Sequence, residues 1–143
     1  MFFGEYRHNL DAKGRLTIPA KFRNQCQDTV MVTIGFDGCI ALYNHEGWQD
    51  YYNELIAANK NARDTRKLLR IIMARTSELE FDKLGRINIP KQLKDKAVLE
   101  KEVVINGAGD HVEIWSEAIW DEFANGAEEE LDDIFEKMFM DKE

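Results

Sequence analysis

A five-residue turn sequence occurs twice in this chain, and the duplication restricts the folds that the chain can adopt. Asp-Ala-Lys-Gly-Arg at residues 11–15 returns as Asp-Lys-Leu-Gly-Arg at residues 82–86, and each copy continues into an apolar segment that ends in Ile-Pro. With one more residue of offset, Trp48 aligns with Trp120. A repeated unit of this length often cannot bury its apolar face alone. The sequence therefore predicts one fold made of two homologous halves.

The size and composition indicate a single compact body. The chain has 143 residues, of which 44% are hydrophobic and 32% charged, enough for an adequate core. No apolar run approaches the roughly 20 residues that a membrane span requires, and the amino terminus lacks the regions of a signal peptide. Cys26 and Cys39 form no CxxC pair, so reduced thiols are expected. We expect a soluble, cytoplasmic protein.

The net charge of −8 by itself argues against a nucleic-acid partner, but the acidity is concentrated near the carboxyl end. From Glu113 onward there are twelve acidic and two basic residues, a balance of −10, which leaves +2 for the rest of the chain. An overall charge of this kind can conceal basic patches elsewhere on the surface. Binding to nucleic acid therefore stays open.

Apolar periodicity predicts an α+β protein with four strands in each half. The expected strands are 6–10, 15–18, 30–34 and 39–43 in the first half, and 78–81, 86–89, 102–105 and 111–115 in the second. Pro19 and Pro90 are each expected as the first residue of a short helix. Longer helices are expected at 46–57 after Asn44, at 64–75, after a Ser116 cap, and, separately, beyond Gly126.

The repeated turns combine residues with defined roles. Asp11 and Asp82 can each accept hydrogen bonds from backbone N–H groups of the turn. Gly14 and Gly85 can adopt positive φ at no steric cost. The alternation of the following strand places Arg15 on its polar face, beside the turn. The two copies are therefore predicted to be shaped alike.

The paired turns, the strands ending in Ile-Pro, and the opening Met-Phe-Phe-Gly at residues 1–4 closely resemble the MraZ family of bacterial proteins, over residues 1 to about 125. The resemblance implies two pseudo-symmetric swapped-hairpin modules of the AbrB/SpoVT type, intertwined as a small β barrel with flanking helices. The implied division is a first module at 5–47, connecting helices at 48–75, a second module at 76–119 and an acidic helical segment at 120–143.

The same resemblance implies a function. MraZ proteins are transcriptional regulators that assemble into rings and bind repeats upstream of their own division and cell-wall operon. Double-stranded DNA and further copies of the chain would thus be the partners, with a cytoplasmic, nucleoid-associated location. The family's DNA-facing arginine corresponds to Arg15 and Arg86, and its turn aspartate to Asp11 and Asp82.

The chemistry of the side chains agrees with such a role. An arginine beside a rigid turn presents a planar fork of donors that suits phosphate oxygens or a guanine edge. Lys13 and Lys83 add charge at the tips, although they occupy different turn positions, opposite Leu84 and Ala12. The simpler alternative is that each arginine only pairs with its own turn aspartate, and both interpretations hold if the aspartate orients the arginine.

Two helical segments admit more than one interpretation. A basic stripe on the 64–75 helix can be a solvated face or an interface on which the acidic helices after Glu117 of the next protomer dock. The stripe comprises Arg63, Arg66, Lys67 and Arg70. Trp48 and Trp120 are expected to seal helices against the sheet, with nucleic-acid stacking as the minor alternative. A protein-binding antitoxin-like module, whose acidic tail covers a basic partner, is the second functional hypothesis.

Catalysis, cofactors and metals are not predicted. Cys39 and His111 occupy equivalent positions of the repeat, but the sequence shows no oxyanion loop or third orienting group. The histidines and cysteines lack the spacing of a zinc site, and sequences of the GxGxxG and Walker type are absent. The sequence therefore favours a binding protein over an enzyme.

Overall fold

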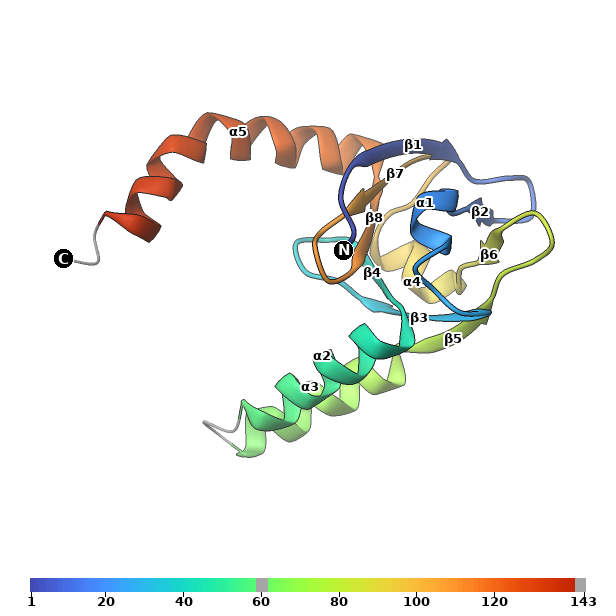
Figure 1. The fold of residues 1–143 in the computed structure, drawn as a ribbon, viewed down its shortest axis with the longest axis horizontal. Coiled ribbons are helices and arrows are strands. Elements are labelled where there is room, and N and C mark those ends of the chain that lie inside the picture. The colour runs from blue at the N-terminus through green and yellow to red at the C-terminus, as the bar shows by residue number, and fades with distance from the viewer. Residues whose placement is uncertain (59–61, 141–143) are drawn as a thin grey trace.

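The computed structural model describes residues 1–58 and 62–140, and these form an α+β fold (Figure 1). The strands of the described part are β1 (Glu5–Asn9), β2 (Arg15–Thr17), β3 (Thr29–Ile34), β4 (Ile40–Tyr43), β5 (Ser77–Glu80), β6 (Arg86–Asn88), β7 (Glu102–Gly107) and β8 (Val112–Ser116). Its helices are α1 (Ala20–Arg23), α2 (His45–Ala57), α3 (Ala62–Ala74), α4 (Lys91–Lys96) and α5 (Glu117–Phe139). Each strand matches its prediction to within one or two residues at either end.

The strands form two antiparallel sheets that both halves build together. One sheet has six strands in the order β1-β7-β8-β4-β3-β5, and the other pairs β2 with β6. Ala41 lies opposite Glu113 at the centre of the large sheet, and Leu16 lies opposite Ile87 in the small one. These partners are also equivalent positions of the repeat, so a pseudo-twofold axis passes through both pairs. The first strand of each half pairs with the third strand of the other half.

The main core lies between the two sheets. Leu16 of β2 and Ile87 of β6 are at most 1% exposed, and Phe22 of α1 and Leu93 of α4 close the space beside them. Neither half could bury these side chains alone, because short isolated hairpins are marginal in water. The duplication in the sequence is thus the reason why the sheet can be assembled within one chain.

The first turns of α2 and α5 pack on the other face of the large sheet. Trp115 of β8 packs against Trp120 and Phe123 of α5, with ring centroids 5.2 Å apart in both pairs. Tyr43 of β4 packs against Trp48 of α2 at 6.0 Å. The expectation that Trp48 and Trp120 seal helices against the sheet is therefore confirmed.

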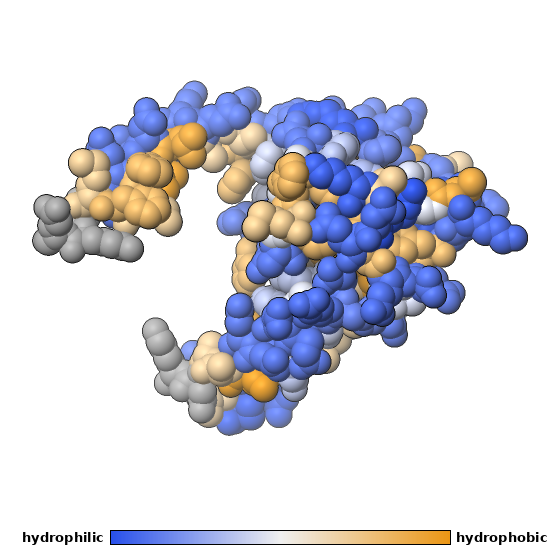
Figure 2. Space-filling view, in the orientation of Figure 1, coloured by the Kyte–Doolittle hydropathy of each residue, from blue (hydrophilic) through white to orange (hydrophobic). Residues whose placement is uncertain are grey.

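Two helical arms extend from the sheet on the side away from the repeated turns (Figure 1). One arm is the α2–α3 hairpin and the other is the distal part of α5. Beyond residue 127 every described residue of α5 is exposed, including Leu131, Phe135 and Phe139. Apolar side chains of this part gather on the inner side of its arc (Figure 2). No helix within the described residues has both the length and the apolar character needed to cross a membrane.

Several local predictions were wrong. α5 runs through Gly126 without a break, because one glycine costs only about 1 kcal/mol in a helix and its neighbours are good helix formers. Ser116 precedes α5 but its hydroxyl makes no capping bond. Pro19 and Pro90 have extended ψ and stand before their helices rather than inside them.

The predicted cap of α2 is confirmed. The Asn44 side chain accepts a hydrogen bond from the Gly47 N–H at 2.8 Å.

Candidate nucleic-acid interface

The first repeated turn is organised by the Asp11 carboxylate. Its Oδ1 accepts hydrogen bonds from the backbone N–H groups of Lys13 at 2.9 Å and Arg15 at 2.8 Å. The Gly14 N–H donates to the Asp11 carbonyl at 3.0 Å, and Gly14 has φ of +77°. A side chain at this φ would be strained, which explains the glycine. Hydrogen bonds among residues 11–15 therefore hold the turn in its conformation.

The second turn reproduces this geometry. Asp82 Oδ1 accepts from the N–H groups of Leu84 and Arg86, both at 2.9 Å. The Gly85 N–H donates to the Asp82 carbonyl at 3.0 Å, and Gly85 has φ of +76°. The roles that the sequence assigned to the aspartates and glycines in shaping the turns agree with this geometry at both copies.

Each turn aspartate also holds the arginine that follows it. Arg15 Nε donates to Asp11 Oδ2 and Arg86 Nε to Asp82 Oδ2, both at 2.7 Å. The side chains of Arg15 and Arg86 remain 31% and 23% exposed. The aspartate of each turn thus orients its arginine through Nε, which leaves the Nη N–H groups outside this bond. The structure therefore contains the ion pair between each arginine and its own turn aspartate that the simpler alternative predicted. This ion pair is compatible with contact between the arginine and a ligand.

The same hydrogen bonds change the titration of the carboxylates. The backbone N–H of Arg15 lowers the pKa of Asp11 most, with further lowering from the Arg15 side chain and the Lys13 N–H. Arg86 and Leu84 lower the pKa of Asp82 in the same way. Both aspartates therefore stay ionised to a lower pH than a free aspartate would, and each keeps its arginine in place.

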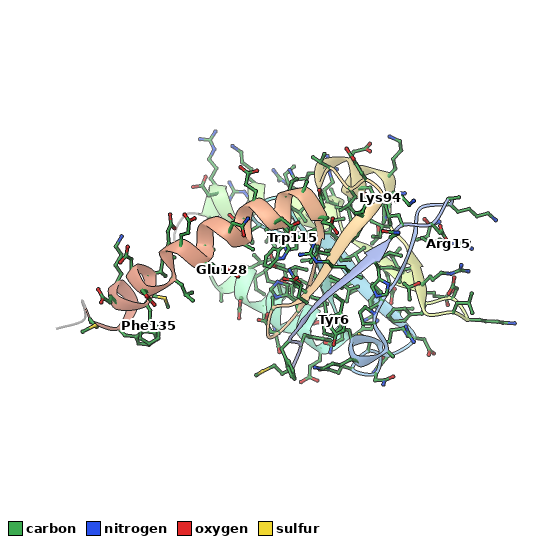
Figure 3. The ribbon with its side chains drawn as sticks, turned by 90° about the horizontal axis from the view of Figure 1, so that it is seen from above. Tyr6, Arg15, Lys94, Trp115, Glu128 and Phe135 are labelled. Atoms are coloured by element: carbon green, nitrogen blue, oxygen red, sulfur yellow. The ribbon has the colours of Figure 1, made fainter. Side chains whose placement is uncertain are left out.

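The two turns lie next to each other at one end of the molecule. β2 pairs with β6, so the hairpin ends of both halves meet there (Figure 1). Arg86 Nη1 also approaches Asp11 Oδ2 at 3.6 Å, across the pseudo-twofold axis. Figure 3 shows Arg15 and Lys94 at the end opposite Phe135 of the α5 arm. The structure brings together the predicted arginines, while their contact with DNA stays a prediction.

The tips of the turns differ between the halves. Lys13 is exposed in the first turn, and its counterpart in the second is Leu84, which is 67% exposed. Lys83 is exposed in the second turn, where the first has Ala12. The two lysines therefore occupy unequal positions, as the sequence indicated.

Two basic residues that sequence reasoning missed lie over the turn glycines. A Cβ placed on Gly14 would lie 2.4 Å from Lys94 Nζ, and one on Gly85 would lie 2.4 Å from the Arg23 guanidinium. Arg23 Nη1 also donates to the Ile18 carbonyl. Arg23 and Lys94 are equivalent positions of the repeat, and both come from the half opposite to the glycine they cover. Both residues are basic and stand 71 positions apart, which is the offset of the repeat. This match in the sequence could have identified them as candidate site residues.

The other candidate sites offer little chemistry. Burial raises the pKa of the Cys39 thiol and the nearby Glu113 raises it further, so Cys39 is a poor nucleophile. His111 instead bonds to Asp110 and Glu113, at 2.6 and 3.2 Å. Among the described residues no group of three or more side chains is placed to hold a metal ion.

Comparison with known proteins identifies relatives along nearly the whole chain. A family model described as "MraZ protein, putative antitoxin-like" matches twice, at residues 1–71 and 72–142. A protein named "Transcriptional regulator MraZ" from Ligilactobacillus salivarius strain UCC118 is 48% identical over 138 residues, 96% of each chain. Proteins with the same name are 46% identical in Lactobacillus helveticus and 41% in Carboxydothermus hydrogenoformans, again over 96% of each chain.

Proposed function

The chain belongs to the MraZ family, and from this premise we propose that it is a transcriptional regulator that binds double-stranded DNA in a sequence-specific way. Its target would be the repeats upstream of its own division and cell-wall operon, and it would act as a ring-shaped homo-oligomer in the cytoplasm, at the nucleoid. The relatives bear the name of a regulator and not of an enzyme. No cofactor is part of this proposal.

The observation that carries the proposal is the pair of matched turns at one end of the molecule. Arg15 and Arg86 are each oriented by a 2.7 Å bond from Nε to an aspartate, and both side chains remain partly exposed. An arginine held in this way loses little conformational freedom when it contacts a phosphate or a guanine. Lys13 and Lys83 would assist at the tips. We therefore assign the DNA-contacting surface to this end.

Within the fold, we infer two AbrB/SpoVT-type swapped-hairpin modules, at 5–47 and 76–119. The pairing of β1 with β7 and of β5 with β3 supports the exchange of hairpins between the halves. The same pairings would bring the two sheets together as a small barrel. Residues 48–75 would then connect the modules, and the acidic segment at 120–143 would serve assembly.

Ring assembly would use the two helical arms. The distal part of α5 exposes an apolar stripe among acidic residues, formed by Leu131, Ile134, Phe135, Met138 and Phe139. The α2–α3 arm offers an apolar groove that includes Leu55, Leu68 and Ile71, beside the basic residues Arg66 and Lys67. Both apolar and charge complementarity would favour docking of the acidic arm of one protomer on the basic arm of the next.

Assembly is tested by the mass of the particle in solution. We expect the full chain to have the mass of a ring in light scattering, a chain ending at Gly126 to lose that mass, and Phe135→Ser to reduce the assembled fraction. Asn125→Ala, an uncharged and exposed position of the same helix outside the apolar stripe, is the matched control. A truncated chain with the mass and salt sensitivity of the full chain would contradict this assembly.

DNA binding is tested by salt-titrated fluorescence anisotropy on the fragment upstream of the gene. We expect Arg15→Ala and Arg86→Ala each to lower affinity by roughly tenfold or more and to make its salt dependence shallower, because each variant lacks a guanidinium that would bind a phosphate or a base. Lys96→Ala, which removes an exposed charge from α4, should bind as the unaltered chain does. Equal binding by all four proteins, with unchanged ring mass, would contradict the assignment of the arginines.

A protein-binding, antitoxin-like role is the second candidate. The exposed acidic surface of distal α5 is the observation that favours it, since a basic partner could lie along it. A pull-down that recovers a stoichiometric basic protein, together with no sequence preference for the upstream DNA, would support this role over the first.

A further inference from the structure

A groove beside the first turn is lined by both halves of the chain. One wall is the turn itself, and the other is α4 with the segment that follows it. Its charged lining consists of Lys13, Lys91, Lys94, Lys101, Asp11, Asp95 and Glu100. Its four lysines outnumber its three carboxylates, although the chain as a whole has a net charge of −8.

Internal pairing leaves part of this positive charge available. Asp11 is bonded to Arg15, and Lys91 is paired with Asp95 at 2.7 Å. By contrast, the ammonium groups of Lys13 and Lys94 have no hydrogen-bond or ion-pair partner among the residues that the structure describes. Lys94 Nζ nonetheless lies directly over Gly14, in the space that a Cβ there would occupy. Lys94 is therefore a half-buried cation held next to the turn.

The corresponding groove beside the second turn has a different charge. Its lining contains Arg23 and Lys83, against the carboxylates of Asp28, Glu80 and Asp82. Arg23 stands where the first groove has Lys94, but it donates to the Ile18 carbonyl. The cation that covers Gly85 is thus already engaged with the protein, and carboxylates outnumber cations around it.

We propose that Lys94 contacts a DNA phosphate beside the first turn, as a residue that one half supplies to the turn of the other, whereas the second groove takes no phosphate. This inference rests on the DNA binding proposed above and extends it to a specific, unequal interface. An ammonium is a compact charge with three donors and binds phosphate oxygens without a fixed orientation. Gly14 lets the Lys94 ammonium lie against the first turn, and Lys94 and Lys13 line the same groove, where a phosphate could meet both charges.

The test compares Lys94→Gln with Lys96→Gln by salt-titrated anisotropy on the upstream DNA. Lys96 lies on the same helix, is exposed and lines neither groove, so it is the matched control. We expect Lys94→Gln to weaken binding several-fold and to make the slope of log K against log salt shallower, by about 0.9 for each phosphate that is no longer neutralised. Lys94→Arg should restore most of the slope, because it keeps the charge. Light scattering checks that ring mass is unchanged.

The outcomes separate this inference from the proposed function. If Arg15→Ala weakens binding while Lys94→Gln behaves as Lys96→Gln does, DNA binding stands and the role of Lys94 is wrong. If Arg23→Gln changes the slope as much as Lys94→Gln does, the inequality of the two grooves is wrong. If the unaltered protein ignores the upstream fragment at low salt, both proposals fail together.

Discussion

The two repeated turns have nearly the same internal geometry but different surroundings. In both, an aspartate accepts two backbone hydrogen bonds at 2.8–2.9 Å and holds the following arginine at 2.7 Å. Above the first turn lies Lys94, whose ammonium group has no partner among the described residues, while the Arg23 guanidinium above the second donates to a carbonyl. Asp11 lies within ion-pair distance of both arginines. Among the described residues, Asp82 forms an ion pair with Arg86 only.

This comparison separates two kinds of information in the repeat. The turn motif determines a local shape, because its hydrogen bonds lie within five consecutive residues. The cations that cover the turn glycines come from residues outside the motif, on α1 and α4, which reach across the pseudo-twofold axis. Copies of a motif can therefore keep one geometry while their binding properties diverge. The following experiments test this contrast, from the largest expected effect to the smallest.

The largest effect is expected from alanine at the turn glycines. Gly14→Ala should destabilise the fold by about 1–2 kcal/mol, the cost of a left-handed conformation for an L-residue. Gly85→Ala should cost about 3 kcal/mol, because the Cβ also displaces Arg23 from its bond to the Ile18 carbonyl. Urea unfolding of both variants at one protein concentration measures the difference. Equal costs would show that Arg23 moves aside as easily as Lys94.

The covering cations should differ in their contribution to stability. Arg23→Gln should lower the free energy of unfolding by about 1–2 kcal/mol, since it removes the bond from a charged donor to the Ile18 carbonyl. Lys94→Gln should leave it within about 0.5 kcal/mol, as is usual for surface changes that break no contact. Urea titration of the two variants checks this, and a costly Lys94→Gln would mean that Lys94 has a structural role instead.

A smaller effect is expected in acid. The folded-state pKa values of Asp11 and Asp82 are lowered, so their stabilisation is fully present above the usual pKa of 3.8. It is lost as the pH falls through the lowered folded values. Asp11→Asn and Asp82→Asn should each flatten the loss of stability below that pH, as followed by urea unfolding at a series of pH values. Variants as acid-sensitive as the unaltered chain would contradict this.

The smallest effect is expected where the helices join the sheet. Arg7 of β1 pairs with Glu117 at 3.3 Å and Asp121 at 2.8 Å of α5, and its counterpart Glu78 of β5 pairs with His45 of α2 at 3.3 Å. Arg7→Ala should speed amide exchange in the first turns of α5 more than Glu78→Ala does in α2, because Arg7 has more partners. Hydrogen–deuterium exchange measures both, and the reverse order would show that aromatic packing dominates the α5 junction.

Much of the candidate site could be predicted because its causes are local. The aspartates, the glycines with positive φ and the adjacent arginines lie within a few residues of one another, so turn chemistry indicates their arrangement. The strand positions followed from alternation for the same reason. α5 was wrongly divided at Gly126, because the cost of one glycine is too small to end a helix that its neighbours favour.

By itself, the sequence determined that the chain has two equivalent halves, that each carries a closed turn with an arginine beside it, and that acidity gathers at the carboxyl end. Only the tertiary structure decided that β1 pairs with β7 and β5 with β3, that both turns meet at one end, and that Lys94 and Arg23 cover the glycines of the opposite half. Hydrogen bonds within a turn depend on neighbouring residues, whereas the contacts between the two halves join residues that are far apart in the sequence, from 45 positions for Val32 with Ser77 to 101 positions for Glu5 with Asn106. Such contacts exist only once the two halves have packed around their shared core.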